Sequence, residues 1–147
     1  MSEVLDVPQP ERCSFCDYLA GVRPFSIVDR SAFTAILVTR EQRGVGHVLV
    51  VPVAHRPTLL DLEPIEASAV MTTVIAAAAA IMSGFKPRGI AIWQNNGFPA
   101  KQTIPHVHFH IAGTLPDGGT EFGDVPELSV EQTDQIADVL RPFLHQR

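Results

Sequence analysis

The sequence predicts an α+β domain, in which roughly five antiparallel strands carry one long helix and one C-terminal helix. Three observations lead to this fold class. Short β-rich segments alternate with turn residues along the first and third quarters of the chain. A long apolar segment of helical periodicity separates them, and a second amphipathic segment follows near the end. Hairpins combined with separate helices are typical of an antiparallel sheet with helices packed on it.

The composition fits one globular domain. The chain has 147 residues, of which 46% are hydrophobic and 18% charged. We treat 1–147 as a single domain, with 1–12 as a loose leader and 113–147 as a variable tail that contains the last helix. The formal net charge is −5 and no two basic residues are adjacent, so we expect no nucleic acid polymer as partner. Residues 1–10 lack the features of a secretion signal, so we expect a cytoplasmic protein with no membrane contact.

The elements of the N-terminal half can be read in order. Cys13–Gly21 could form a short helix that ends at the glycine. The runs Ser26–Asp29 and Ala32–Thr39 are β-rich and close together, which predicts a hairpin. Arg43–Gly46 is a turn, and it leads into His47–Val53, whose β-branched residues are typical of a buried central strand.

The long helix is predicted over Leu62–Gly84. Pro64 suits its first turn and Gly84 is a candidate for its C-terminal cap. Its apolar positions recur at helical spacing and are Val70, Met71, Val74, Ile75, Ala78 and Met82. The run Ala67–Phe85 is mostly alanine with interspersed hydroxyl side chains, so we interpret it as a packed helix rather than a membrane span.

The C-terminal half adds two strands and the last helix. Ile90–Gln94 and Ile104–Ala112 are predicted strands, separated by a polar loop. Ser129 and Gln132 form a capping box at the start of the last helix. Pro142 is expected to kink or end that helix.

Three histidines alternate in the second of these strands. In a strand alternate residues share a face, so His106, His108 and His110 lie on one side, while Val107 and its alternate neighbours face the core. Positions i and i+4 of a strand lie about 13 Å apart, whereas a zinc–nitrogen bond measures about 2 Å. Two of the histidines could therefore share a metal ion, but at least one is left for other work.

Catalysis is the work that imidazole suits best at this position. A neutral imidazole with a pKa near its usual value of about 6.5 is a good nucleophile near neutral pH. Flanking imidazoles can donate hydrogen bonds to a phosphoryl oxygen or protonate a leaving group. A hydrolase that instead uses two of these histidines as ligands of a catalytic zinc remains an alternative.

The segment Pro105–Ile111 resembles the signature of the histidine triad (HIT) family, in which three histidines alternate with apolar residues. The resemblance extends over most of the chain, from Cys13 to Ala112. It includes the following further segments, in order: Cys13–Cys16, Gly46–Pro52 with His55 after it, Gln94–Gly97 and Gln102–Ile104.

The resemblance implies a role for each matched residue. His108 matches the nucleophile, which attacks the α-phosphorus and forms a nucleotidyl-histidine intermediate. His110 matches the residue that holds the phosphoryl oxygens or the leaving group, and a histidine there favours hydrolases over transferases. His106 matches the residue that orients the nucleophile, and His47 the fourth histidine that supports the triad. Asn95, Gln102 and Thr103 match positions at or beside the phosphate.

Two positions depart from the family pattern. Thr39 stands where nucleoside-binding members often carry an acidic residue for the ribose hydroxyls, and a neutral hydroxyl lacks the charge-assisted acceptor. Lys101 stands where a glycine usually precedes Gln102. Its ammonium could contact a second phosphate, or it could be a solvated loop residue.

The cysteines predict a metal site. Cys13 and Cys16 form the chain's only C-x-x-C pair, and two cysteines alone cannot complete a tetrahedral zinc site. The resemblance to bacterial HIT proteins implies a structural zinc held by Cys13, Cys16, His55 and His106, with no organic cofactor. The alternatives from the residues alone are a buried pair of reduced thiols and a thioredoxin-like redox pair, although no strand precedes the C-x-x-C as in a βαβ pattern.

The expected function is a nucleotide hydrolase or phosphoramidase that acts through His108. Adenosine phosphoramidates and dinucleoside polyphosphates are the candidate substrates. A non-enzymatic nucleotide-binding module is the alternative if the triad binds without turnover. The resemblance also implies a homodimer joined through an edge strand and the long helix, where the alanines of 76–80 would allow close approach.

Overall fold

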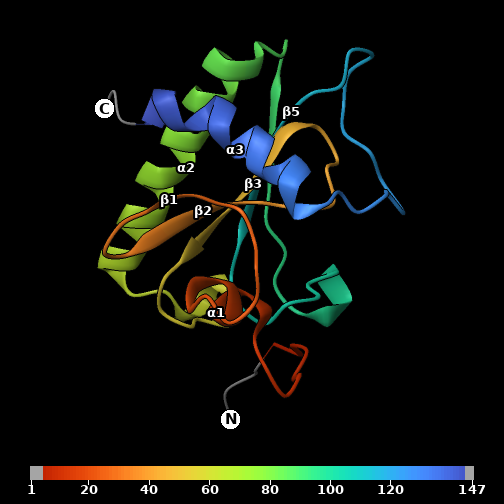
Figure 1. Cartoon of the computed structure of the whole chain (residues 1–147). Coiled ribbons are helices and arrows are strands. Elements are labelled where there is room, and N and C mark those ends of the chain that lie inside the picture. The colour runs from red at the N-terminus through yellow and green to blue at the C-terminus, as the bar shows by residue number, and fades with distance from the viewer. Residues whose placement is uncertain (1–4, 145–147) are drawn as a thin grey trace.

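The computed structural model describes residues 5–144, and Figure 1 shows their arrangement. One five-stranded antiparallel sheet forms the centre, with the strand order β1-β2-β3-β5-β4. The strands are β1 (Ile27–Arg30), β2 (Thr34–Val38), β3 (Val45–Pro52), β4 (Ile90–Trp93) and β5 (Phe109–Gly113). The helices are α1 (Ser14–Leu19), α2 (Pro64–Phe85) and α3 (Val130–Leu144), with short 3₁₀ turns at Leu59–Asp61 and Phe98–Ala100. The α+β prediction, with one long and one C-terminal helix, is confirmed.

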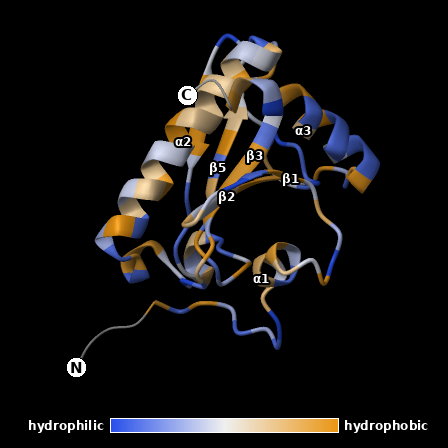
Figure 2. Ribbon diagram, turned by 60° about the vertical axis from the view of Figure 1, so that its left-hand side comes forward, coloured by the Kyte–Doolittle hydropathy of each residue, from blue (hydrophilic) through white to orange (hydrophobic). Residues whose placement is uncertain are grey.

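The two faces of the sheet pack against different helices. Ile36 and Val38 of β2 lie in the main core with α2 and α3, whereas Ala35 and Leu37 lie in a second cluster with Phe15 of α1. This alternation is the expected consequence of the two-residue period of a strand. Figure 2 shows α2 and α1 on opposite sides of the apolar strands. The α1 side of the sheet carries the histidines.

The last strand is shorter than predicted. It was expected over 104–112, but β5 begins only at Phe109. Before it, the His106 N–H donates to the Ile104 carbonyl and the Val107 N–H to the Arg56 carbonyl, so neither bonds to a strand. Pro105 has no N–H to give to a sheet. The segment with His106 and His108 is therefore an irregular stretch that leads into the strand carrying His110.

The long helix carries two apolar stripes where the sequence pattern was interpreted as one. Val70 and Val74 are buried in the main core, but Met71, Ile75 and Met82 are 48%, 64% and 43% exposed. The helix passes the predicted end at Gly84 and is capped by Lys86 in the left-handed conformation, with φ of 53°. By length and composition α2 could cross a membrane, but its buried stripe packs on the sheet, as in a core helix of a soluble fold.

The last helix begins as predicted, and of the two effects expected of Pro142, ending the helix does not occur. The Ser129 hydroxyl accepts the Gln132 N–H at 3.2 Å, and the Gln132 side chain accepts the Ser129 N–H at 2.8 Å, which completes the capping box. The helix does not end before Pro142, because α3 continues through it to Leu144. Residues 5–12 of the leader form no helix or strand, but the carbonyl of Asp6 accepts the Phe98 N–H.

Candidate active site

The triad meets His47 and two aromatic residues on the α1 side of the sheet. His47 comes from β3, His110 from β5 and Trp93 from β4, so these three side chains lie on successive strands. The rings of His108 and His110 are 5.0 Å apart between centroids. Although only His110 belongs to a strand, the three histidines share one side, as predicted.

The hydrogen bonds of His108 leave one particular nitrogen free. Its Nδ1 lies 2.9 Å from the carbonyl oxygen of His106. A carbonyl can only accept, so Nδ1 carries the hydrogen and Nε2 carries the lone pair. His108 is thus held in the tautomer whose free lone pair is on Nε2, and the carbonyl of His106 fixes that tautomer.

A chain of hydrogen bonds fixes the opposite tautomer in His110. The backbone N–H of Arg43 donates to Nδ1 of His47 at 3.1 Å. Neutral His47 therefore carries its hydrogen on Nε2, which lies 3.0 Å from Nδ1 of His110. Nδ1 of His110 is then an acceptor, and its Nε2 carries the hydrogen. Side by side, the site offers a lone pair on His108 and an N–H donor on His110.

Burial keeps these imidazoles uncharged. It lowers the pKa of His47 to about 3, with a smaller contribution from the nearby Arg43 cation. Burial also lowers the pKa of His110 to about 2, with help from His108 and His47, and it lowers the pKa of His108. The physical cause is the cost of placing a cation where water cannot solvate it. Each of these imidazoles is therefore more readily neutral than a solvated histidine.

Helix α1 supplies an apolar wall beside His108. The Phe15 ring lies edge-on to His108 and His106, with centroid distances of 5.0 and 5.6 Å. Phe15 is buried, and Leu37 and Leu49 of the sheet lie in the same cluster. His108 itself is only 9% exposed. The wall excludes water from one side of the imidazole.

Three residues of the loop after β4 were expected at or beside the phosphate, and they differ in how accessible their side chains are. Gln102 is 1% exposed, and its side chain accepts the Gly97 N–H and donates to the carbonyls of Pro57 and Ile104. It therefore shapes the loop rather than presenting a free group. Asn95 is partly exposed and Thr103 exposed, so both are accessible, as a phosphate ligand needs to be.

The two departures from the family pattern both lie outside the helices and strands. Thr39 follows the end of β2, and its hydroxyl accepts the Glu41 N–H at 3.2 Å. The side chain of Gln42 donates to the carbonyls of Thr39 and His47, so it ties that strand end to the fourth histidine. Lys101 is exposed and has φ of 74°, a left-handed conformation that favours glycine.

The four predicted zinc ligands lie close together, with His106 as the member that belongs to the triad. Nδ1 of His106 lies 3.4 Å from Sγ of Cys13 and 3.6 Å from Sγ of Cys16, and Nδ1 of His55 lies 3.4 Å from Sγ of Cys16. All four donor atoms lie within 4.8 Å of one another. Tetrahedral zinc needs separations of about 3.3–3.8 Å, given bond lengths of about 2.0–2.3 Å, so small shifts would complete the site.

The chemistry of the donors also fits a divalent cation. Nε2 of His106 donates to the Pro52 carbonyl at 2.8 Å, so its Nδ1 lone pair is directed at the cysteines. Burial, and then the adjacent Cys13 thiol, raise the pKa of Cys16 to about 11. A bound cation would reverse that shift, since it deprotonates a coordinating thiol. Among residues 5–144, His108 and His110 belong to no comparable donor cluster.

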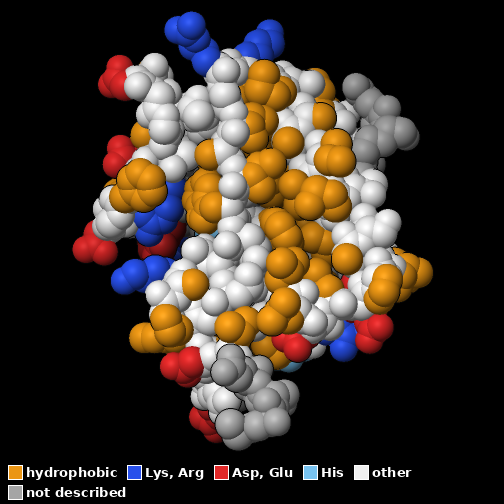
Figure 3. Space-filling view, turned by 180° about the vertical axis from the view of Figure 1, so that it is seen from behind, with side chains coloured by type: hydrophobic (Ala, Val, Ile, Leu, Met, Phe, Trp, Pro, Cys, Tyr) orange, Lys and Arg blue, Asp and Glu red, His pale blue; other side chains and the backbone are white. Residues whose placement is uncertain are grey.

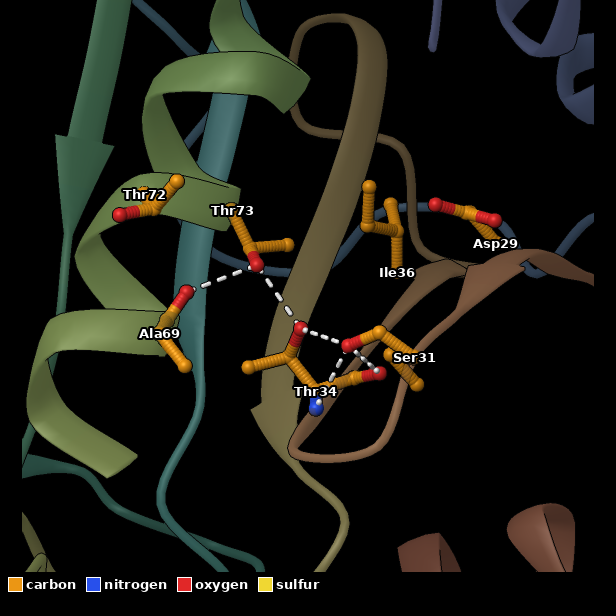
Figure 4. Close-up of a pocket in the computed structure, with 8 residues that line it drawn as sticks. Asp29, Ser31, Thr34, Ile36, Ala69, Thr72 and Thr73 are labelled. Carbon is orange, nitrogen blue, oxygen red and sulfur yellow. Dashed lines mark hydrogen bonds between the residues drawn. The ribbon is translucent and has the colours of Figure 1, made fainter. Parts of the chain in front are cut away.

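A separate cavity of about 260 Å³ lies on the α2 side of the sheet, away from the histidines. Figure 4 shows its hydroxyl chain, in which Thr73 donates to the Ala69 carbonyl and bonds Thr34, which in turn bonds Ser31. These hydroxyls satisfy one another, so we interpret the chain as a link between α2 and the β1–β2 hairpin.

Four site residues were missed by the sequence reasoning. Phe15 packs against His108, Gln42 and Arg43 form hydrogen bonds with His47, and Trp93 stacks on His110. The position of Trp93 opposite His110 depends on the β4–β5 register, which no sequence motif reveals. The hydrogen bonds of His47 with Gln42 and with the Arg43 N–H likewise depend on the conformation of the turn before β3.

Comparison with known proteins agrees with this geometry. The sequence pattern of the HIT domain matches residues 23–116. Protein hit of Bacillus subtilis is 32% identical over 101 residues, which cover 69% of this chain and 70% of that protein. Two Schizosaccharomyces pombe proteins are also similar. The bis(5′-nucleosyl)-tetraphosphatase [asymmetrical] is 33% identical, over 78% of this chain and 60% of its own. The adenosine 5′-monophosphoramidase hnt1 is 29% identical, over 76% and 78%.

Solved structures show the same fold. A HIT-like protein from Bartonella henselae superposes with a TM-score of 0.84 at 23% identity, covering 92% of this chain and 98% of that one. A zinc-bound histidine triad family protein from Mycobacterium smegmatis superposes with a TM-score of 0.78 at 24% identity, covering 91% and 94%.

Proposed function

Since the chain belongs to the HIT domain family, we propose that it is a nucleotide hydrolase that forms a covalent intermediate on His108. The observation that carries the proposal is the hydrogen bond from His108 Nδ1 to the His106 carbonyl, which leaves the Nε2 lone pair free. The low pKa of His108 supports it, because the imidazole stays unprotonated at neutral pH.

The proposed reaction has two displacements at the α-phosphorus. The His108 Nε2 lone pair forms a bond to phosphorus while the bond to the leaving nitrogen or oxygen breaks. The leaving atom takes that electron pair and accepts a hydrogen bond from His110 Nε2–H. A leaving nitrogen gains a proton from water as the bond breaks and departs as a neutral amine, whereas a leaving phosphate oxygen departs as an anion. Water then attacks the same phosphorus, the P–N bond to His108 breaks, and the water's proton passes to solvent. The products are a nucleoside monophosphate, the leaving group and the free imidazole.

Zinc is proposed as a structural ion held by Cys13, Cys16, His55 and His106. When bound, it would fix α1 and the leader against the segment that precedes His108. It would take no part in the displacement. His106 would bind it through the ring nitrogen Nδ1, which lies near the Cys13 sulfur, whereas His106 contacts His108 through its backbone carbonyl. The donor cluster supports this role over a catalytic zinc on two triad histidines. The zinc-bound relative supports zinc as the ion.

The proposed substrates are adenosine phosphoramidates or dinucleoside polyphosphates. The names of the two yeast relatives, a monophosphoramidase and a tetraphosphatase, span both kinds. Asn95, Thr103 and Lys101 are proposed to contact phosphate, Gln102 to shape their loop, and Thr39 to lie near the ribose. We also propose a cytoplasmic homodimer, with the exposed stripe of α2 at its interface.

The test is steady-state turnover of adenosine 5′-phosphoramidate by the wild type, by His108→Ala and by EDTA-treated wild type. The proposal expects at least about a thousandfold loss of kcat in His108→Ala, with circular dichroism unchanged. It expects EDTA to leave kcat largely intact while the protein stays folded. Loss of turnover with EDTA in a folded protein would favour the catalytic zinc. Nucleotide binding without turnover in any sample would favour the binding module.

A further inference from the structure

Trp93, the chain's single tryptophan, lies flat against the third triad histidine. The ring centroids of Trp93 and His110 are 4.8 Å apart and the planes differ by only 7°. Trp93 also contacts His47, at 5.1 Å and 52°. The stack is built into the sheet, because Trp93 and His110 are directly paired residues of β4 and β5.

Hydrogen bonding alone does not hold the plane of the His110 ring. The final torsion of a histidine side chain is broad and nearly two-fold. The bond from His47 Nε2 selects which edge of the ring faces His47, but a hydrogen bond tolerates tilts of up to about 30°. Contact with a flat indole face restrains the ring in that remaining direction. The two contacts therefore act at right angles to each other.

We propose that Trp93 is a positioning residue, which holds the plane of His110 and so aims the His110 Nε2–H at the atom that leaves phosphorus. The inference rests on the proposed function, in which His110 serves the leaving group. It adds a residue outside the histidine motif. It also predicts that the loss of kcat on replacing this residue depends on the chemistry of the leaving group.

The dependence follows from where negative charge develops. An amine leaving a phosphoramidate gathers charge on a poorly stabilised nitrogen, so a well-aimed donor lowers the barrier. A 4-nitrophenolate spreads its charge over the ring and needs the donor much less. Misaiming His110 should therefore slow the first substrate far more than the second.

The experiment compares Trp93→Leu with Trp93→Phe, which keeps a flat ring, on adenosine 5′-phosphoramidate and on the 4-nitrophenyl ester of AMP. Ile92→Val is the matched control, because Ile92 is on the same strand but 51% exposed, and it alternates with Trp93. Trp93→Leu is expected to lower kcat for the phosphoramidate roughly tenfold or more and kcat for the ester less than about threefold, with little change in KM. Trp93→Phe and Ile92→Val should stay near the wild type. Equal losses on both substrates, or none, would overturn the inference.

A second measurement does not need turnover. In ¹⁵N-labelled wild type, a scalar coupling across the His47 Nε2–H···Nδ1 His110 hydrogen bond is expected, and it should persist in Trp93→Phe. It should be weakened or lost in Trp93→Leu if the stack holds the ring. An unchanged coupling in a folded Trp93→Leu would overturn the inference. Absence of turnover in the wild type would count against the proposed function alone, and the coupling would still decide the role of Trp93.

Discussion

The four histidines of the site differ in which ring nitrogen carries a hydrogen and which carries a free lone pair. The difference arises because each imidazole has a different hydrogen-bond partner. A carbonyl fixes the hydrogen of His108 on Nδ1, whereas the chain from the Arg43 N–H through His47 fixes that of His110 on Nε2. A second carbonyl, that of Pro52, directs the free nitrogen of His106 toward the cysteines. The backbone around the motif, rather than the motif alone, therefore determines which nitrogen can react.

The lysine in the phosphate loop gives a prediction at the residue scale. Lys101 and Lys86 both have positive φ, at 74° and 53°, so each carries the strain of a left-handed non-glycine residue. Replacing either by glycine should raise the free energy of unfolding by roughly 1 kcal/mol, measured by urea denaturation. If the Lys101 ammonium contacts a second phosphate, Lys101→Gly should also lower kcat/KM for a dinucleoside polyphosphate. Lys86→Gly, at the end of α2, is the control that should leave kcat/KM unchanged. Unchanged kcat/KM in both variants would make Lys101 an ordinary loop residue.

The residue types of the site could be predicted from sequence, but their partners could not. The three histidines, His47 and the four metal donors lie where the motif spacing indicates. The supporting contacts of Phe15, Gln42, Arg43 and Trp93 come from strand register and turn geometry. Gln102 is a further example. Its position in the motif predicts a contact with the substrate, but its buried side-chain amide forms hydrogen bonds with Gly97 and Pro57 instead.

At the scale of elements, hydrophobic pattern predicted the sheet and both long helices but missed two details. The strand over 104–112 was overextended because its residue types favour β structure, while Pro105 and the bonds to Arg56 prevent pairing there. The apolar positions of α2 were merged into one stripe. An all-round apolar helix does not reveal which side meets the sheet.

The metal site predicts how the N-terminal elements respond to chelation. Helix α1 has only six residues, so its order depends on tertiary contacts rather than on intrinsic helicity. EDTA should raise amide hydrogen exchange over 13–19 and 104–108, while exchange in β2 and α2 stays near its starting value. Mass spectrometry of peptides measures both regions in one experiment. A Cys16→Ser variant should show the raised exchange before any EDTA is added. Equal exchange with and without the chelator in a zinc-loaded sample would contradict a structural role for the ion.

At the scale of the whole molecule, the exposed stripe of α2 predicts self-association. Figure 3 shows hydrophobic side chains gathered across one face of the molecule. The exposed large apolar side chains include Met71, Ile75 and Met82 of α2 and Ile92 of β4. Contiguous apolar surface of this kind marks an interaction site. The alanines expected at the interface are mostly used within the protomer, since Ala76, Ala77 and Ala80 are buried.

Light scattering tests this association at micromolar concentration. The wild type should have the mass of a dimer, and Ile75→Asp that of a monomer, because a carboxylate in the stripe would be buried without a partner. Phe122→Asp is the control, as Phe122 is 89% exposed on the tail loop, away from α2. A monomeric wild type would remove the dimer from the proposal.

The buried histidines make the stability of the whole fold depend on pH. The folded pKa values of His47 and His110, about 3 and 2, lie below the unfolded value of about 6.5. Between these values the unfolded chain binds more protons, so their contribution is complete above pH 6.5 and is lost as the pH falls. Between pH 6.5 and 5 the free energy of unfolding should drop by up to roughly 2–3 kcal/mol per pH unit. Urea denaturation with EDTA present measures it. His47→Gln should lower the slope by roughly 1.4 kcal/mol per pH unit, the share of one proton, because burial also lowers the pKa values of His106 and His108, which keep their contributions. A flat profile would mean that these imidazoles are solvated.

The central claim is that phosphorus becomes bonded to His108 during turnover. Intact mass spectrometry after brief mixing with adenosine 5′-phosphoramidate, followed by peptide mapping, tests it directly. The account predicts a transient adenylyl group on the peptide that contains His108, absent from His108→Ala. AMP formed at full rate with no adduct at any mixing time, or with the adduct on another residue, would contradict it.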